Sequence, residues 1–312
     1  MVVYPKKSRP SYFLFKVTDG IIIFAPKLTL MKNLLFILLT LISFLGTAQN
    51  YSGDTWAQAK AKGQATISLA YVETPSFVYK DKGTLTGICV DIMNDFVKWA
   101  NDTKKIKLTA NYVGDGSNFR GMYDKVKAST GGVFGLGNIT ITEERKKEVK
   151  FSPSYITNFA ILITQNSVAT LAKFEDMKTT FGKLTAYTAK GTLNEKRIND
   201  LKKKYFPDMK ITLTATSQET FEKVTTDPNG FAYLDLAFYL EAVSLSKPVK
   251  RHPIGDQTSE KFAFIMPINS DWGPALDEFF ASNGGYANSA QYKAILRKHL
   301  GETGVKLLQS AK

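Results

Sequence analysis

Strand-like and helix-like segments alternate along residues 65–308, and this alternation constrains the fold more than any other feature of the chain. Short apolar runs, such as 65–71 and 160–164, are typical of buried strands. Between such runs lie stretches with apolar residues at helical spacing, for example 91–100. This order predicts an α/β fold in which mostly parallel strands are flanked by helices.

Strands and helices are predicted along the whole of this region. The predicted strands are 65–71, 107–113, 132–136, 160–164, 183–187, 210–215, 231–234, 249–254 and 261–266. The predicted helices are 91–100, 118–128, one starting near 142, 192–205, 218–225, 236–245 and a helical tail at 272–308. No linker rich in Pro, Gly and Ser separates two units, and no internal repeat is evident. We therefore expect two lobes joined by extended crossing strands rather than independent domains in series.

Residues 31–48 have the order of a secretory signal peptide: Lys32, an apolar run at 34–45, and then small residues. A membrane-spanning helix needs roughly 20 apolar residues, so a cleaved signal fits this shorter run better than a retained N-terminal anchor. Residues 1–30 are then best explained by a start codon assigned too early, with the second methionine as the true start. A long, partly apolar leader is the alternative.

Composition argues against several classes of function. The formal net charge is +13, but lysines such as 202–204 stand near acidic residues, which favours a solvated surface over a nucleic-acid site. A single cysteine, Cys89, allows no internal disulfide, and its apolar neighbours predict a buried side chain. With only His252 and His299 besides, a zinc site has almost no ligands. We expect no metal, no cofactor and no nucleic-acid partner.

The segment 135–155 carries the most chemical information. A buried strand ends at a loop of small and hydroxyl residues, and Thr142 can cap the helix that follows. A guanidinium at Arg145 can fork onto a carboxylate, while Thr140 and nearby backbone N–H groups bind the same anion. The alternative for Arg145 is a surface arginine paired with Glu148.

Two residues of the second half have both a binding and a capping interpretation. Asp235 follows a predicted strand, at the carboxyl edge where α/β sheets place their ligands. It also precedes a helix, which an aspartate caps well. Thr192 likewise starts a predicted helix, and its two interpretations are ligand binding and capping alone, so both stay open.

The sequence NITITEERKKEVKFSPSY at 138–155 resembles a motif of the family 3 bacterial extracellular solute-binding proteins, in their amino-acid branch. Four further segments resemble the family in the expected order: TPSFVYKDKGTLTGICVDI at 74–92, KGT at 190–192, FAYLDLAFY at 231–239 and FIMPINSDWGPALDEFF at 264–280. Together the five segments span nearly all of the chain after the predicted signal.

The resemblance implies the two-lobed periplasmic-binding-protein fold of type II. Each lobe would hold a mixed, mostly parallel sheet flanked by helices, and two crossover strands would join the lobes. The implied boundaries are 49–158 with 265–312 for lobe 1 and 159–264 for lobe 2, with 1–48 removed. It also implies a periplasmic location.

The resemblance further implies roles for eight residues. Arg145 would grip the α-carboxylate of a ligand, helped by Thr140 and, from the other lobe, by Thr192. Asp235 would take the ammonium group and Asn138 would offer it a carbonyl. The remaining wall would be formed by Phe77, lying on the aliphatic part of the ligand, and by Glu73 or Tyr71. Phe77 has a second interpretation, as a plain core residue.

Two positions depart from the family pattern. Gly137 stands where the family often has a serine, and Ser76 stands where a proline commonly precedes the aromatic residue. Neither change touches the charge pair formed by Arg145 and Asp235. Both put the side-chain specificity in doubt more than the class of ligand.

The implied function is capture of a small amino acid, or a similar zwitterion, and its delivery to the permease of an ABC importer by a monomeric, non-catalytic protein. One rival is an enzyme on the same scaffold that dehydrates arogenate or prephenate, for which Glu73 is the candidate general acid. Another is a soluble sensing module, since transport and sensing need the same closing cleft.

Overall fold

The computed structural model describes residues 51–114 and 118–310. The predicted signal peptide at 31–48 and the preceding residues 1–30 lie outside the described part. None of the helices in the described part combines the length and the apolarity that crossing a membrane requires.

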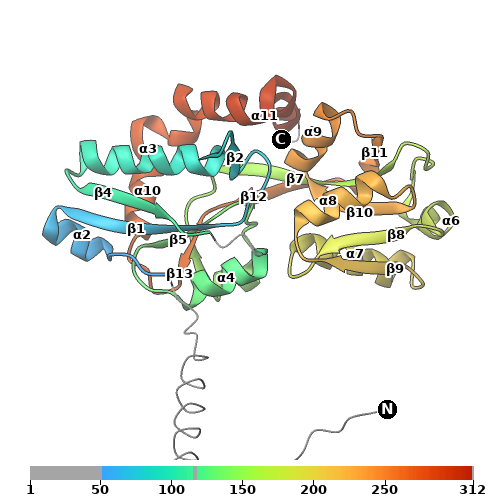
Figure 1. The fold of residues 1–312 in the computed structure, drawn as a ribbon, viewed down its shortest axis with the longest axis horizontal. Coiled ribbons are helices and arrows are strands. Elements are labelled where there is room, and N and C mark those ends of the chain that lie inside the picture. The colour runs from blue at the N-terminus through green and yellow to red at the C-terminus, as the bar shows by residue number, and fades with distance from the viewer. Residues whose placement is uncertain (1–50, 115–117, 311–312) are drawn as a thin grey trace, which may run out of the picture. The chain divides into compact units, whose positions relative to one another are not determined.

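Helices and strands alternate as expected (Figure 1). The strands are β1 (Gln64–Tyr71), β2 (Tyr79–Asp81), β3 (Thr84–Thr86), β4 (Lys107–Tyr112), β5 (Val133–Leu136), β6 (Val149–Phe151), β7 (Ile156–Gln165), β8 (Thr185–Ala189), β9 (Lys210–Thr214), β10 (Gly230–Asp235), β11 (Val249–Arg251), β12 (Gln257–Phe262) and β13 (Ile265–Pro267). The helices are α2 (Trp56–Lys62), α3 (Ile88–Thr103), α4 (Phe119–Ala128), α5 (Glu143–Lys146), α6 (Met177–Phe181), α7 (Leu193–Tyr205), α8 (Ser217–Thr226), α9 (Leu236–Ser244), α10 (Gly273–Ala281) and α11 (Ala290–Ser310).

The strands form two main sheets. The first has the order β4-β1-β5-β13-β6, and the second has the order β11-β7-β10-β8-β9 with β12 also paired to β7. The parallel pairs are β1 with β4 and β5 in the first sheet, and β8 with β9 and β10 in the second. Strands β7, β12 and β13 pair antiparallel with their neighbours. The sheets are therefore mixed, as predicted, but the prediction that they are mostly parallel was wrong, because the described strands of the two main sheets form five antiparallel pairs and four parallel ones.

Two antiparallel strands connect the sheets. Strand β7 leads into the second sheet, and β12 returns beside it, with Asn158 opposite Glu260 and Ile156 opposite Phe262 (Figure 1). The prediction of one continuous strand at 261–266 was wrong, because the chain leaves β7 at Phe262 and enters the first sheet at Ile265. Such a change of sheet interrupts the ladder of hydrogen bonds, although the apolar pattern runs on without a break.

Both faces of the first sheet are covered by helices. On β1, Ile67 and Leu69 join the core cluster that contains Phe96 of α3. Ala70 points to the opposite face and joins the cluster that contains Met122 of α4. This alternation is the period of two that a strand imposes on its side chains. With both faces covered, a site is expected at the carboxyl ends of the parallel strands.

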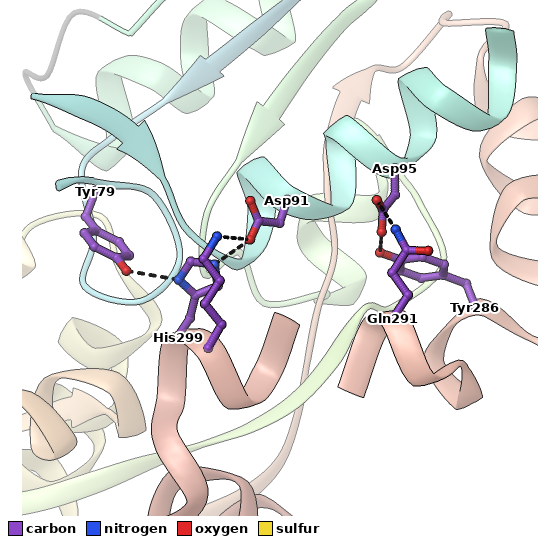
Figure 2. Close-up of polar contacts among 7 residues, drawn as sticks. Tyr79, Asp91, Asp95, Tyr286, Gln291 and His299 are labelled. Atoms are coloured by element: carbon purple, nitrogen blue, oxygen red, sulfur yellow. Dashed lines mark hydrogen bonds and ion pairs between the residues drawn. The ribbon is translucent and has the colours of Figure 1, made fainter. Parts of the chain in front are cut away.

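Polar contacts attach the C-terminal helix α11 to α3 (Figure 2). Asp91 of α3 accepts hydrogen bonds from His299 and Lys298, both at 2.8 Å, and the other ring nitrogen of His299 lies 3.0 Å from the Tyr79 hydroxyl. Burial opposes ionisation of Asp91, but the bonds from Lys298 and His299 prevail and lower its pKa. Nearby, Asp95 accepts hydrogen bonds from Tyr286 and Gln291 (Figure 2).

The cysteine and the two histidines are buried or hydrogen-bonded within the fold. Cys89 is fully buried, as predicted, and burial raises the pKa of its thiol to about 12. The Nδ1 atom of His252 accepts a hydrogen bond from the Leu171 N–H at 3.0 Å, and its Nε2 lies 2.8 Å from the Thr164 hydroxyl. Within the described part of the chain, no group of three or more His, Cys, Asp or Glu residues is placed to hold a metal ion.

Candidate functional site

A cavity lies between the carboxyl ends of the parallel strands of the first sheet and those of the second. The space between its atoms is about 720 Å³, with the open solvent at its mouth included. Its polar and charged lining comes from both halves of the described chain: Glu73, Asn138, Thr140 and Arg145 from the part around the first sheet, and Thr192, Asn194, Arg197, Asp235 and Glu260 from the part around the second.

The short helix α5 positions Arg145 at this cavity. The Thr142 hydroxyl caps the helix by accepting a hydrogen bond from the Arg145 backbone N–H at 3.2 Å. The guanidinium Nη1 donates to the Thr140 carbonyl at 3.0 Å, and the Phe119 ring centroid lies 4.9 Å from the guanidinium carbon. Burial lowers the pKa of Arg145. Backbone and ring thus hold the guanidinium in one place.

Arg145 has no carboxylate partner among residues 51–114 and 118–310. The alternative of pairing with Glu148 is contradicted, because that carboxylate accepts from Lys127 at 2.8 Å and from the Tyr123 hydroxyl at 3.0 Å. A half-buried guanidinium without a counter-charge is costly, which favours binding of an anion. Thr140 lies beside it, 9% exposed, with a hydroxyl that makes no hydrogen bond within the described part.

Asp235 lies across the cavity at the end of β10 and is 7% exposed. Its carboxylate does not cap α9, so capping is not its role. It accepts instead from the side-chain amide of Asn138, which comes from the first sheet, and from that of Asn158 at 3.5 Å. Burial raises the pKa of Asp235, against the opposing effects of the Asn138 bond and the Arg197 charge.

A second charge pair, which the sequence analysis missed, lines the same cavity. Arg197 of α7 and Glu260 of β12 form an ion pair, with side chains 13% and 7% exposed. The Arg197 Nη1 also donates to the Asn194 side-chain oxygen at 2.6 Å. Burial lowers the pKa of Arg197, and the nearby Asp235 opposes this effect.

Thr192 and Glu73 line the cavity, but both have local partners. The Thr192 hydroxyl accepts from the Glu195 N–H at 3.3 Å, as the cap of α7, and donates to the Ala189 carbonyl at 2.7 Å. The Glu73 carboxylate forms an ion pair with Lys80 at 2.8 Å, and 47% of its side chain is exposed. Each side chain can therefore contact a ligand only in addition to its existing bond, or by losing it.

The model of one protein family, the bacterial extracellular solute-binding proteins of family 3, matches residues 67–302. The chain belongs to this family. The match includes most of β1, the charged residues of the cavity and most of the C-terminal region. A search of curated proteins finds no match.

Solved structures with the same fold are numerous. An ancestral arginine-binding protein bound to arginine has 20% identity and a TM-score of 0.62, covering 76% of this chain and 98% of its own. The arginine-, lysine-, histidine-binding protein ArtJ from Geobacillus stearothermophilus has 20% identity and a TM-score of 0.61, covering 76% and 96%. The ancestral amino acid-binding protein AncCDT-1 has 19% identity and a TM-score of 0.59, covering 78% and 98%. These similarities confirm the two-lobed type II fold.

Two residues predicted for the site of this solute-binding protein do not line the cavity. Phe77 is 1% exposed and packs edge-on against Phe262 and Tyr155, with centroids 5.6 and 6.4 Å apart. Its loop folds back on itself, with the Val78 N–H bonded to the Thr74 carbonyl at 3.0 Å, so the ring enters the core. Tyr71 packs edge-on against Tyr112, 6.2 Å away.

Backbone geometry explains both departures of this chain from the family pattern. Gly137 has a φ of 139°, a conformation that a serine would adopt only with strain. Ser76 has a φ of 62°, which the ring of a proline excludes. Both substitutions therefore follow from the path of the chain at these loops.

Weak signals in the sequence mark the polar residues that were missed. Asn194 and Arg197 are spaced three apart on α7, on the side of the helix that carries the buried residues Ile198 and Leu201. Asn158 interrupts the otherwise largely apolar strand β7. Polar residues on a buried surface need partners, and that requirement is the signal that could have indicated them.

Proposed function

We propose that this family 3 protein captures a small amino acid, or a similar zwitterion, in the cleft between its lobes and delivers it to an ABC importer outside the cytoplasm. One observation carries the proposal. The half-buried guanidinium of Arg145, which has no carboxylate partner in the described part of the chain, and the buried carboxylate of Asp235 line the same cavity. A zwitterion offers the two complementary charges on adjacent atoms.

The carboxylate of the ligand binds at Arg145. The contacts to Thr140 and Phe119 fix the plane of the guanidinium before the ligand arrives, which reduces the entropy lost on binding. The unbonded Thr140 hydroxyl supplies a further donor. Hydrogen bonds to charged groups contribute about 1.5–3 kcal/mol each, enough to offset much of the cost of dehydrating a carboxylate.

The ammonium of the ligand binds at Asp235. Without ligand, the carboxylate is stabilised by N–H donors from Asn138 and Asn158. An ammonium group brings a full positive charge to a buried acid whose pKa burial raises, so ionisation becomes favourable. Asn138 then turns its side-chain oxygen to the ammonium or moves aside. Thr192 contributes contact area rather than a new hydrogen bond.

Ligand binding favours the closed arrangement of the lobes, which we assign to residues 49–158 with 265–312 and to 159–264. Arg145 and Asp235 come from different lobes in this assignment, so a ligand that bridges them binds the closed form better than an open one. Such a difference in affinity is what shifts a conformational equilibrium. The closed, loaded protein is the form that a permease would recognise, with a single copy sufficient for binding.

The solved relatives support an amino acid as the ligand class, since two are described as binding arginine, or arginine, lysine and histidine. AncCDT-1 is described as a precursor of cyclohexadienyl dehydratase, and this description is the observation that favours an enzyme as the second candidate function. However, Glu73, the candidate general acid, is half exposed and paired with Lys80. A carboxylate that is already engaged by a lysine is not free to contact a bound substrate as a general acid must, so binding without turnover is the better-supported function.

Thermal unfolding in the presence of each common L-amino acid tests the proposal. A ligand at one hundred times its Kd stabilises the folded state by about 2.7 kcal/mol, which raises the melting temperature by several degrees. We expect one or a few amino acids to do so for the wild-type protein and not for Arg145→Met. Absence of stabilisation across the whole panel would contradict the proposal.

A further inference from the structure

Arg197 and Glu260 lie beside each other in the wall of the cavity and come from different elements. Arg197 is held on α7 by Asn194, and Glu260 lies on β12 opposite Asn158 of β7. The two charged groups form an ion pair whose side chains are largely buried. A buried ion pair is often no more stabilising than a pair of apolar residues. The stability of the fold therefore does not explain why this ion pair lies in the wall of a ligand cavity, and charged groups in such a position are candidates for a functional role.

The charges that line the cavity balance without a ligand side chain. Arg145 and Asp235 are complementary to the carboxylate and ammonium of a zwitterion. Arg197 and Glu260 neutralise each other, and Glu73 is neutralised by Lys80. A cationic or anionic ligand side chain would add a charge without a free partner in this lining, and such a charge loses its hydration without compensation.

Resting on the proposed function, we propose that Arg197 and Glu260 determine side-chain specificity and select an uncharged, polar amino acid, with a carboxamide as the preferred group. A carboxamide carries both an acceptor and a donor. Its oxygen accepts from the Arg197 guanidinium and its NH₂ donates to the Glu260 carboxylate, so it binds both members of the pair and leaves the charge balance unchanged.

The two alternatives each need the pair to break. A dicarboxylic amino acid could take Arg197, but Glu260 would then be left as a buried, unpaired carboxylate. A basic amino acid could take Glu260 and would leave Arg197 unpaired. An aliphatic side chain would leave the pair intact but would cover its remaining polar atoms without replacing their hydrogen bonds.

Calorimetric titration of the purified protein with L-glutamine, L-asparagine, L-leucine, L-glutamate and L-lysine tests this inference. We expect glutamine or asparagine to bind at least tenfold more tightly than the other three, a difference of about 1.4 kcal/mol or more. Tighter binding of glutamate, lysine or leucine would overturn the inference and leave the proposed function intact. Binding of no amino acid would contradict the proposed function itself.

Single substitutions of the pair should change the preference in opposite directions. In Glu260→Gln the guanidinium loses its counter-charge, so glutamate should gain at least tenfold relative to glutamine. In Arg197→Gln the carboxylate is unpaired, so lysine should gain by a similar factor. Lys261→Gln and Lys196→Gln are the matched controls, because these lysines are neighbours of the pair on β12 and α7 with exposed side chains.

The double variant Arg197→Gln/Glu260→Gln provides a second test in case the single variants, each with one unpaired charge, fold poorly. It removes both charges and keeps the charge balance, so it should bind carboxamide ligands and show no new preference for charged ones. An unchanged ligand ranking in folded single variants, as judged by circular dichroism, would overturn the inference.

Discussion

The two walls of the cavity differ in how far their polar groups are already satisfied. On the first-sheet wall, the Arg145 guanidinium pairs with no carboxylate and the Thr140 hydroxyl makes no hydrogen bond within the described residues. On the second-sheet wall, Arg197 is paired with Glu260, and Asp235 accepts hydrogen bonds from two asparagines. On the proposed function, we therefore expect the first wall to contribute most of the affinity and the second to select the ligand.

The walls also differ in how they are built. Arg145 is positioned by residues at most a few places away, through the Thr142 cap and the Thr140 carbonyl. The second wall brings together three strands and a helix, because Asn158, Glu260 and Asp235 lie on β7, β12 and β10 and Arg197 lies on α7. Substitutions in the first wall should therefore have effects that are largely independent of one another, whereas the effects of substitutions in the second wall should depend on each other.

Replacement of the first-wall cation should have the largest effect. We expect Arg145→Met to weaken binding by about 100- to 3,000-fold, since loss of one partner of a buried pair costs about 3–5 kcal/mol. The change in Kd is measured by calorimetry. The control is Arg297→Met, whose exposed guanidinium pairs with Glu302 on the protein surface. If Arg145→Met weakened the affinity by less than tenfold, the expectation that the first wall contributes most of the affinity would be wrong.

Replacement of the second-wall acid should separate affinity from stability. We expect Asp235→Asn to weaken binding about 10- to 100-fold, because hydrogen bonds to a charged group contribute about 1.5–3 kcal/mol. The ligand-free variant should melt at the same temperature as the wild type or higher, because burial raises the pKa of Asp235 and thus disfavours its ionised form. Loss of both affinity and stability would show that the acid has a structural role instead.

The affinity should depend on pH through Asp235. Binding of an ammonium needs the carboxylate, and the pKa of that group in the ligand-free protein is raised by burial. As the pH falls through this raised pKa, protonation competes with the ligand, and the affinity drops by up to about tenfold per pH unit. The drop begins at a higher pH than for an ordinary aspartate. Titrations at several pH values should show it in the wild type and a flatter profile in Asp235→Asn.

The smallest effect on binding is expected for Thr192, whose hydroxyl is used within the second wall. We expect Thr192→Val to change the Kd by less than about threefold, since the cap, and not a ligand, holds the hydroxyl. Its cost should appear in the free energy of unfolding, at about 0.5–2 kcal/mol for the lost cap. Chemical denaturation measures this cost, and a large loss of affinity without loss of stability would contradict the interpretation.

Features that depend on neighbouring residues could be predicted from the sequence. The first strand, the helix at 192–205 and the strand that ends at Asp235 were found within about two residues, because apolar periodicity and turns are local properties. The caps at Thr142 and Thr192 were also foreseen. The family resemblance, which the match over residues 67–302 confirms, extended this information to the two-lobed fold.

Features that depend on long-range packing could not be predicted. A run of apolar residues does not reveal that the chain changes sheets between Phe262 and Ile265, since both strands are buried. Nor does the loop sequence show that Phe77 turns into the core rather than the cavity.

The sequence by itself therefore determined the order of most strands and helices, the caps at Thr142 and Thr192 and the family, because these follow from patterns within short stretches of chain. Only the tertiary structure decided which charged residues face one another. The partners Arg197 and Glu260 are far apart in the sequence and meet because β12 crosses back beside β7. Pairing of this kind is set by where whole elements pack, which no local pattern specifies.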